Sequence, residues 1–273
     1  MKKPSADQIQ DTAKKVAEIV YAARGISTPR HFTAAIIAAA GNSTRMGGKT
    51  SKQLMLLRGL PVLAHTLLAY QHADCIHEII VVGRKEDFPA YRALAEQHGI
   101  TKLRVLTEGG ATRQESVLCG LRQVSAKTKF VAIADGARCL ITPEQINAVC
   151  RAAYRTGAAT AATPATDTVK IANSLKFIDS TPERETVWLA QTPQIFSYKL
   201  YHAAAYYALE QGFAATDDNS LVEFINHKVK LVDCGRENLK ITTPVDLLFA
   251  EAILRAREQD AADQANDAGG NKQ

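Results

Sequence analysis

Three basic side chains lie in a polar segment that directly follows a run of small apolar residues. The run covers residues 34–40, and Arg45, Lys49 and Lys52 come after Gly41. Such a run, bounded by glycine, is typical of a buried strand in a parallel sheet, and open α/β sheets bind ligands at the carboxyl ends of these strands. Glycine lets backbone N–H groups approach phosphate oxygens, whose charge the cations neutralise. The segment therefore indicates a site for a phosphorylated ligand.

Two familiar phosphate-binding patterns do not fit this segment. The fingerprint G-x-G-x-x-G is absent, because Ser43 stands two residues after Gly41. Residues 48–50 supply the end of a Walker A pattern, but its first glycine would fall on Ser43. The pattern that fits is A-A-G-x(3)-R-M-x(5)-K-Q, with Arg45 and Lys52 seven residues apart. On spacing alone, a strand-to-helix turn with solvated cations also fits.

This pattern resembles the signature of nucleotidyltransferases that join a nucleoside triphosphate to a sugar or polyol phosphate. More narrowly, it resembles that of the 2-C-methyl-D-erythritol 4-phosphate cytidylyltransferases of the non-mevalonate isoprenoid pathway. Further motifs between about residues 32 and 256 match the same family in the same order: G-G-x-x-R-x-x-S-V at 109–117, D-x-A-R at 135–138, D-T-x-K at 167–170, Q-T-P-Q-x-F at 191–196 and N-x-K-x-T-x-P-x-D-L at 238–247. In the glycine-rich second motif, a helix N-cap at Thr112 explains part of the pattern equally well.

One motif departs from the family, which usually has H-D-A-A-R-P at this point. Here Ala134 replaces the histidine, Gly136 an alanine and Cys139 the proline, whereas Asp135 and Arg138 are retained. A carboxylate at the carboxyl end of a central strand suits a Mg²⁺ ion that bridges triphosphate oxygens. The retained pair fits the chemistry, and the departures indicate a divergent subgroup.

The resemblance implies attack by a polyol phosphate oxygen on the α-phosphorus of CTP, with release of pyrophosphate. A phosphate monoester has a second pKa of about 6, so near pH 7 it is already an anionic nucleophile. The reaction therefore needs no histidine base and no serine or cysteine nucleophile. It needs charge neutralisation, in-line positioning and a metal ion.

The resemblance also implies a role for individual side chains, with Asp135 as the ligand of the Mg²⁺ cofactor. The expected catalytic residues are Arg45, Lys52, Lys240 and Arg184. The expected nucleotide-binding residues are Ala39, Ala40, Gly41, Gly110, Ala111, Ser116, Asp135, Gly136 and Arg138. The expected residues around the acceptor phosphate are Thr168, Arg184, Thr192 and Thr216. For Lys49, a solvated loop cation is the better interpretation.

The implied fold is α/β: a Rossmann-like three-layer sandwich with a mainly parallel central sheet and a projecting β-arm. We expect an N-terminal helical extension and linker at 1–30, a cytidylyltransferase domain at 31–258 with the arm at about 165–189, and a disordered tail at 259–273. Besides the strand at 34–40, further strands are expected at 78–83, 103–106, 130–134, 158–163 and 228–232. Helices are expected at 61–72, 87–98, 143–154 and 197–212, and after residues 216 and 243. In the family, the arm embraces a second subunit, which implies a homodimer.

Composition limits the remaining classes of function. The 273 residues are 46% hydrophobic and 22% charged, with a net charge of +5 that suits an anionic substrate but is too weak and dispersed for nucleic acid. No apolar run approaches membrane-spanning length, and the N-terminus lacks the apolar region of a secretion signal. Five scattered cysteines without a C-x-x-C pair favour reduced thiols in a cytoplasmic protein.

Two alternatives remain open. A ribitol 5-phosphate cytidylyltransferase shares the first loop, the Q-T-P-Q run and the final N-x-K-x-T, but Lys170 and Trp188 look more like the erythritol enzymes. A non-catalytic nucleotide-binding module, left by decay around Asp135, is the more distant alternative. Retention of Asp135 together with the four expected catalytic cations argues against that decay.

Overall fold

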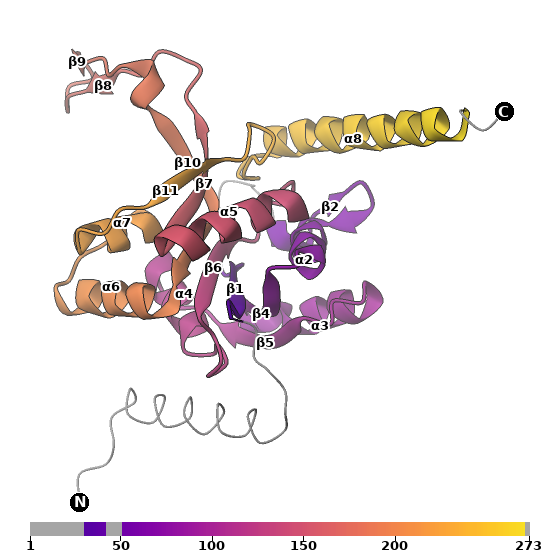
Figure 1. Ribbon diagram of the computed structural model, residues 1–273, viewed down its shortest axis with the longest axis horizontal. Coiled ribbons are helices and arrows are strands. Elements are labelled where there is room, and N and C mark those ends of the chain that lie inside the picture. Colours follow the sequence, from indigo (N-terminus) through magenta and orange to yellow (C-terminus); the bar gives the residue numbers. More distant parts are fainter. Residues whose placement is uncertain (1–29, 42–50, 271–273) are drawn as a thin grey trace, which may run out of the picture.

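The computed structural model describes residues 30–41 and 51–270 (Figure 1). The predicted N-terminal helix, within residues 1–29, lies outside the described residues. So do residues 42–50, which include Arg45 and Lys49, and residues 271–273.

A seven-stranded sheet forms the centre of the molecule, in the order β11-β7-β10-β6-β1-β4-β5. Strand β10 is antiparallel to both of its neighbours, and the other pairs are parallel. The expected mainly parallel sheet is therefore confirmed. The strands are β1 Thr33–Ala38, β4 Ile76–Gly83, β5 Leu103–Glu108, β6 Phe130–Asp135, β7 Ala158–Pro164, β10 Trp188–Ser197 and β11 Lys230–Asp233.

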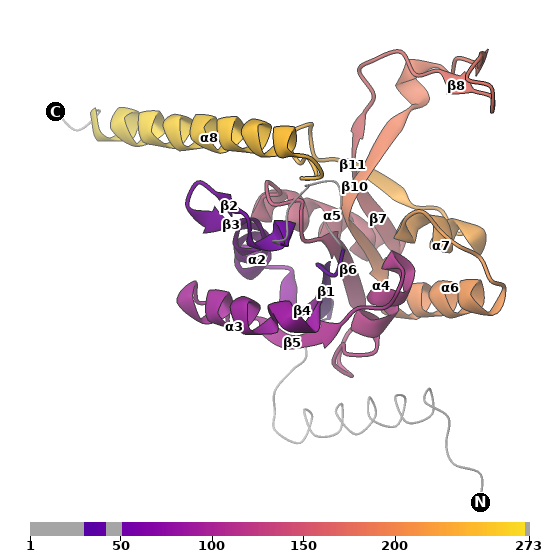
Figure 2. The same cartoon turned by 180° about the vertical axis from the view of Figure 1, so that it is seen from behind.

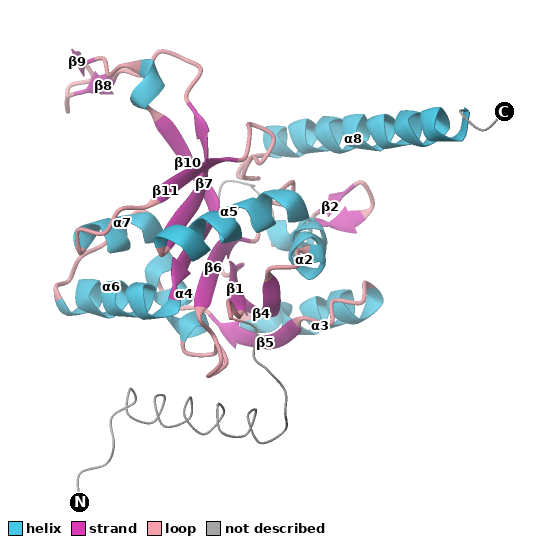
Figure 3. Ribbon diagram, in the orientation of Figure 1, coloured by secondary structure: helices cyan, strands magenta, loops and turns pink. Residues whose placement is uncertain are grey.

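Helices cover both faces of this sheet, as Figure 3 shows. Because side chains alternate along a strand, Ala35 and Ile37 of β1 enter one core, with α2, α3 and α5, while Ala34 and Ile36 enter the other, with α4, α6 and α7. This is the expected three-layer sandwich. The helices are α2 Val62–His72, α3 Phe88–Gln97, α4 Arg113–Leu121, α5 Pro143–Thr156, α6 Tyr198–Glu210, α7 Asp218–Phe224 and α8 Pro244–Gly270.

The strand order reverses beside β1, and this places the carboxyl end of β1 next to Asp135. From β1 the chain builds β4 and β5 on one side and then crosses to β6 on the other. In the register of the sheet, Ala38 pairs with Val82 of β4 and with Asp135 of β6. Ligands of open α/β sheets bind at such a reversal, outside the carboxyl ends of the strands. The fold thus brings the carboxyl end of β1 and Asp135 to one edge of the sheet.

A two-stranded arm projects from the body, as predicted (Figure 1). Its base continues β7 and β10, and its outer part carries β8 Ile171–Ala172, β9 Ile178–Ser180 and the short helix η4 Arg184–Thr186. Leu175 and Phe177 near the tip are 75% and 68% exposed. At the base, Val169 and Trp188 are partly buried, whereas Leu189 is 53% exposed.

The C-terminal helix α8 is longer than composition predicted. It continues to Gly270, so residues 259–270, expected to be disordered, are helical, and the helix extends past the body in Figure 2. The tail is rich in alanine, the best helix former, and has no proline or glycine before Gly269. The prediction of disorder rested on the low content of large apolar residues in this tail. It was wrong for residues 259–270, because their high helix propensity continues α8.

The first turns of α8 pack on a third, smaller core. This core includes Leu57, Val62, Cys139 and Ala250, with Leu57 coming from the hairpin of β2 Leu56–Leu57 and β3 Leu60–Pro61. Cys139, one of the departures from the family motif, is thus a buried packing residue, and burial raises the pKa of its thiol to about 12. Among the described residues, no helix is long and apolar enough to cross a membrane.

Candidate active site

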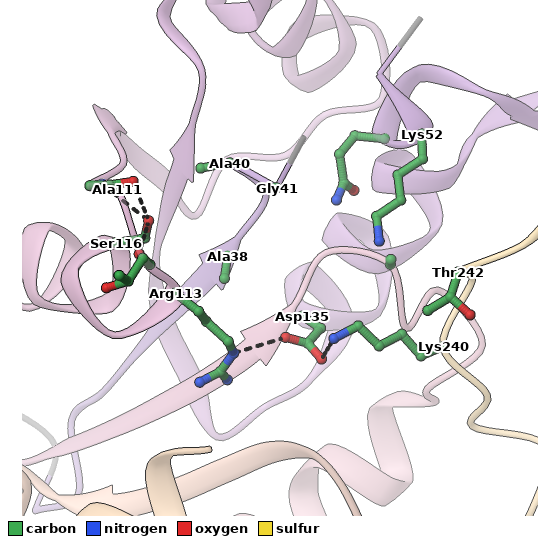
Figure 4. A pocket seen from close by; sticks show the side chains of 14 residues that line it. Ala38, Ala40, Gly41, Lys52, Ala111, Arg113, Ser116, Asp135, Lys240 and Thr242 are labelled. Carbon is green, nitrogen blue, oxygen red and sulfur yellow. Dashed lines mark hydrogen bonds and ion pairs between the residues drawn. The ribbon is translucent and has the colours of Figure 1, made fainter. Parts of the chain in front are cut away.

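A cavity of about 420 Å³ opens at the reversal point of the sheet (Figure 4). Its walls come from the end of β1, the turn between β5 and α4, the end of β6 and the segment before α8. Residues that line it are Ala38, Ala40, Gly41, Lys52, Gln53, Gly110, Ala111, Thr112, Arg113, Ser116, Asp135, Ala137, Lys240 and Thr242. Most of the residues predicted to contact the nucleotide are therefore brought together. Ala39 is an exception, because its side chain is buried in the core.

The turn between β5 and α4 is shaped by close backbone packing. A Cβ on Gly109 would lie 2.6 Å from the Cβ of Ala40, so only glycine fits against the first loop. Ser116 Oγ accepts from Gly110 N (3.1 Å) and donates to the carbonyl oxygen of Thr112 (2.8 Å). Thr112 also caps α4 in a capping box with Glu115. The predicted cap is confirmed, and Ser116 lies at the cavity while holding the turn in shape.

Three basic side chains surround the carboxylate of Asp135. Lys240 Nζ lies 2.7 Å from its Oδ2, Arg113 Nε lies 3.4 Å from its Oδ1, and Arg138 Nε lies 3.9 Å from its Oδ2. Only 11% of the Asp135 side chain is exposed. Burial alone would raise the pKa of this carboxyl, but the attraction of Lys240, then of Arg113 and Arg138, holds it below its usual value. Asp135 is therefore an anion at neutral pH.

Lys240 reaches the cavity from a firmly anchored segment. The buried side chain of Asn238 donates to the carbonyl oxygen of Thr192 (3.0 Å), and Ile241 N donates to that of Ala137 (2.8 Å). These bonds on either side of Lys240 aim its ammonium at Asp135, as Figure 4 shows. The expected return of this segment toward the first loop is confirmed, because Lys52 Nζ donates to the carbonyl oxygen of Ile241 at 3.2 Å.

Arg113 was part of a motif, but no role was predicted for it. Its Nη1 lies 2.7 Å from Oδ2 of Asp218, so one guanidinium joins two buried carboxylates. Burial raises the pKa of Asp218 against the opposing pull of Arg113. Burial would lower the pKa of Arg113, but Asp218 and Asp135 together raise it. Two signals in the sequence marked it: Arg113 is the arginine of the family motif at 109–117, and it starts a helix directly after a glycine-rich turn.

Gln53 is a second residue that the predictions missed. Its side chain is buried and lines the cavity beside Gly136. A Cβ on Gly136 would lie 2.9 Å from Oε1 of Gln53, so glycine in place of the family's usual alanine leaves room for this amide. Gly136 itself does not line the cavity, and its backbone bonds to Ala38 and Thr66. The other departure, Ala134, is buried in the core.

Arg138 and Thr192 hold backbone segments that lie next to the cavity. Arg138 Nη1 donates to the carbonyl oxygen of Asn238 at 2.7 Å, and its side chain lines a separate cavity of about 450 Å³ at the base of the arm. Burial lowers its pKa. The hydroxyl of Thr192 accepts from Asp135 N at 3.0 Å, which fixes the end of β6. Both residues therefore lie next to Asp135 without lining the cavity.

The remaining predicted acceptor residues are exposed. Arg184 Nη2 donates to Oγ1 of Thr168 at 3.1 Å, and both residues lie on the arm. Thr216 precedes α7 by two residues. None of the three lines the cavity of the same chain. Among the described residues, no group of three or more His, Cys, Asp or Glu side chains could hold a metal ion, and Asp135 is the carboxylate that lines the cavity.

Comparison with known proteins agrees with this geometry. Residues 33–256 match the model of the family described as IspD: 2-C-methyl-D-erythritol 4-phosphate cytidylyltransferase. The chain belongs to this cytidylyltransferase family. The match begins at β1 and ends within α8, so it contains every element that lines the cavity.

Relatives with the same family name support the assignment. The chain is 43% identical over 226 residues to 2-C-methyl-D-erythritol 4-phosphate cytidylyltransferase of Pelotomaculum thermopropionicum, covering 82% of this chain and 95% of the relative. It is 41% identical over 228 residues to the enzyme of the same name from Alkaliphilus oremlandii, covering 83% and 97%.

Solved structures of cytidylyltransferases share the fold. The 4-diphosphocytidyl-2C-methyl-D-erythritol synthase of Anaerococcus prevotii matches with a TM-score of 0.74 at 34% identity, covering 82% of this chain and 99% of that one. The 2-C-methyl-D-erythritol 4-phosphate cytidylyltransferase of Thermus thermophilus matches with a TM-score of 0.67 at 32% identity, covering 82% and 99%. The predicted Rossmann-like fold is thus confirmed.

Proposed function

We propose that the chain transfers CMP from CTP to 2-C-methyl-D-erythritol 4-phosphate, giving 4-diphosphocytidyl-2-C-methyl-D-erythritol and pyrophosphate in non-mevalonate isoprenoid biosynthesis. The observation that carries the proposal is the family match over residues 33–256, which includes the whole lining of the cavity. Relatives named for this reaction support the erythritol substrate over ribitol 5-phosphate.

The cavity supplies charge rather than a base. Lys52 and Lys240 line it together, and no histidine is among the described residues that do. An acceptor phosphate needs no base near pH 7, because its second pKa is about 6. We assign Lys52, Lys240 and, from the sequence pattern, Arg45 to the charge that develops on the α-phosphate. Such preorganised cations are the main source of rate enhancement in phosphate transfer.

Asp135 would hold the Mg²⁺ cofactor together with oxygens of the triphosphate. The fit rests on the side chain itself: it lines the cavity, and its pKa lies below the usual value, so it is a carboxylate anion. Mg²⁺ is commonly held by one or two carboxylates plus substrate phosphates. The ion would neutralise charge on the triphosphate. Lys240, now paired with Asp135, would turn toward the phosphate when CTP binds.

The arm completes the proposal with a second subunit. Its exposed tip residues, Leu175 and Phe177, need a covering surface, because a lone two-stranded ribbon is marginal in water. A homodimer with two-fold symmetry would bury both arms in the isologous way. Arg184 and Thr168, which are bonded to each other on the arm, would then bind the acceptor phosphate of the neighbouring subunit. The described free cysteines, five in all, are consistent with a cytoplasmic location.

Pyrophosphate release tests the proposal directly. The purified chain is assayed with CTP, Mg²⁺ and either 2-C-methyl-D-erythritol 4-phosphate or ribitol 5-phosphate at equal concentrations. We expect a higher specificity constant for the erythritol substrate. A higher constant for ribitol 5-phosphate would transfer the assignment to that enzyme class, and no release with either acceptor would favour a non-catalytic module.

A further inference from the structure

Arg113 occupies an unusual place among the cations of the cavity. Its guanidinium lies between carboxylates from two separate elements, Asp135 at the end of β6 (3.4 Å) and Asp218 at the start of α7 (2.7 Å). Its side chain is 31% exposed and lines the cavity, where Figure 4 shows it directed at Asp135, while its contact with Asp218 is to a carboxylate that is only 1% exposed.

Asp218 is held more tightly than the ion pair alone requires. Its side chain is 1% exposed, and its Oδ1 accepts from the hydroxyl of Tyr201 at 2.5 Å. The backbone N–H of Asp218 donates to Oε1 of the buried Gln194 at 2.9 Å. A carboxylate held by Tyr201, on a backbone held by Gln194, keeps the guanidinium of Arg113 in one orientation, because removing either member of the ion pair would leave a buried charge uncompensated.

Lys240 differs from Arg113 in its partners rather than in its exposure. Among the described residues its ion pair is with Asp135 alone, whereas its side chain is 35% exposed and that of Arg113 31%. A lysine carries a compact charge on a flexible stem, whereas an arginine presents a rigid planar fork. An incoming phosphate can therefore draw Lys240 away from Asp135, but Arg113 could follow only by abandoning Asp218.

We propose that Arg113 is a positioning residue that keeps the Asp135 carboxylate in place while Lys240 exchanges that carboxylate for a phosphate of the nucleotide. Asp218 anchors Arg113 during the exchange. This inference rests on the proposed function. It also links the two halves of the site, since Thr216, assigned to the acceptor, precedes Asp218 by two residues.

The central test compares Arg113→Lys with Arg104→Lys. Arg104 is a matched control, because its Nε lies 2.8 Å from Oε2 of the buried Glu78, outside the cavity. Outer partners of a ligating group typically contribute about 10- to 100-fold to metal affinity or activity. We expect Arg113→Lys to lower kcat by about that factor, and Arg104→Lys to leave kcat within about twofold. Melting temperatures of the two variants should fall by similar amounts.

A binding measurement separates this inference from the proposed activity. Calorimetric titration with CTP and Mg²⁺, without acceptor, should give a Kd about 10-fold weaker for Arg113→Lys than for Arg104→Lys. If the wild type releases no pyrophosphate, the proposed function fails, but this comparison still decides the role of Arg113. Equal CTP affinities in the two variants, or a kcat of Arg113→Lys within twofold of the wild type, would overturn the inference.

The anchoring role of Asp218 has its own test. Asp218→Asn should lower kcat in the same direction, and the double variant with Arg113→Lys should be no worse than Arg113→Lys alone, because the two residues act as one unit. Tyr201→Phe loosens Asp218 without removing its charge, so it should give a smaller loss of kcat in a folded protein. Additive losses in the double variant, or full kcat in Tyr201→Phe, would contradict the anchoring role.

Discussion

The cavity and the arm hold their side chains in opposite ways. Around the cavity, Asp135 is buried, bonded through its backbone to Thr192 and paired with Lys240 and Arg113. On the arm, Arg184 is exposed and bonded to a threonine that is exposed as well. The cavity is thus organised by its own chain, whereas the arm presents groups that no part of the chain within residues 30–41 and 51–270 covers.

This difference indicates that the cavity and the arm have different roles. Preorganised charges can stabilise a transition state only if the surrounding fold holds them in position. The cavity meets this condition in one subunit. The arm would hold its charged groups in position only when it packs against another surface. The exposed side chains of Leu175 and Phe177 near its tip would make the contact with that surface. Substitutions in the cavity should therefore act locally, and substitutions on the arm should act through assembly.

The largest expected effect comes from removing the metal. EDTA should abolish pyrophosphate release and added Mg²⁺ should restore it, because without the metal ion the triphosphate charge would face only the side-chain cations Lys52, Arg113 and Lys240 in the described part of the cavity. The measurement is the initial rate before and after chelation. Activity that is indifferent to EDTA would remove Asp135 as a metal ligand and leave it as the partner of Lys240 and Arg113.

Next in size is the loss of one cavity cation. Lys52→Ala should lower kcat by about 10² to 10³, as is typical when one preorganised charge contact is lost. Lys230 on β11 provides the control, since its side chain is exposed and does not line the cavity. Lys230→Ala should keep kcat within a few-fold. A Lys52→Ala variant that is as active as Lys230→Ala would show that the first loop is not catalytic.

Subunit mixing tests the contrast between the regions most directly. Arg184→Ala and Lys52→Ala should each be inactive, and exchange of subunits between them should restore about a quarter of the wild-type activity. The reason is arithmetic: about half of a statistical mixture is heterodimer, and each heterodimer has one site with both cations intact. Mass spectrometry of labelled subunits verifies the exchange. A mixture that stays inactive despite exchange, or an active monomer, would place Arg184 in the site of its own chain.

The sequence predicted some parts of the structure better than others. The central strands were predicted to within a few residues, because β1, β4 and β6 are short apolar runs bounded by polar or glycine residues, a local pattern. The cavity lining was predicted largely from the family resemblance. In contrast, the composition of residues 259–270 predicted disorder, whereas α8 continues through them. Alanine-rich segments without large apolar residues are found both in helices and in disordered chains, so composition alone does not distinguish the two.

The supporting contacts of the site could not be predicted, because they join residues that are distant in the sequence. Nothing local connects Arg113 with Asp218, or the hydroxyl of Thr192 with the backbone of Asp135. Such pairs form only when α4, α7 and β10 are packed on the same sheet. The role of Gln53 was missed for a similar reason: it belongs to the first motif, but its contact with Gly136 joins residues 83 positions apart.

The smallest expected effect is on stability in acid. The cations around Asp135 hold its pKa below its unfolded value, which is about 3.9 for a free aspartate. Its contribution to stability is therefore fully present above that pH and is lost as the pH falls through the folded pKa. The free energy of unfolding of the wild type should decline more steeply below about pH 4 than that of Asp135→Asn, as urea titrations at several pH values would show.

The control is Asp179→Asn, on the exposed arm. Its free energy of unfolding should parallel that of the wild type to within about 0.5 kcal/mol throughout. Equal acid slopes in the wild type and Asp135→Asn would mean that the cation cluster does not stabilise the fold, and would remove the main electrostatic distinction between the cavity and the arm.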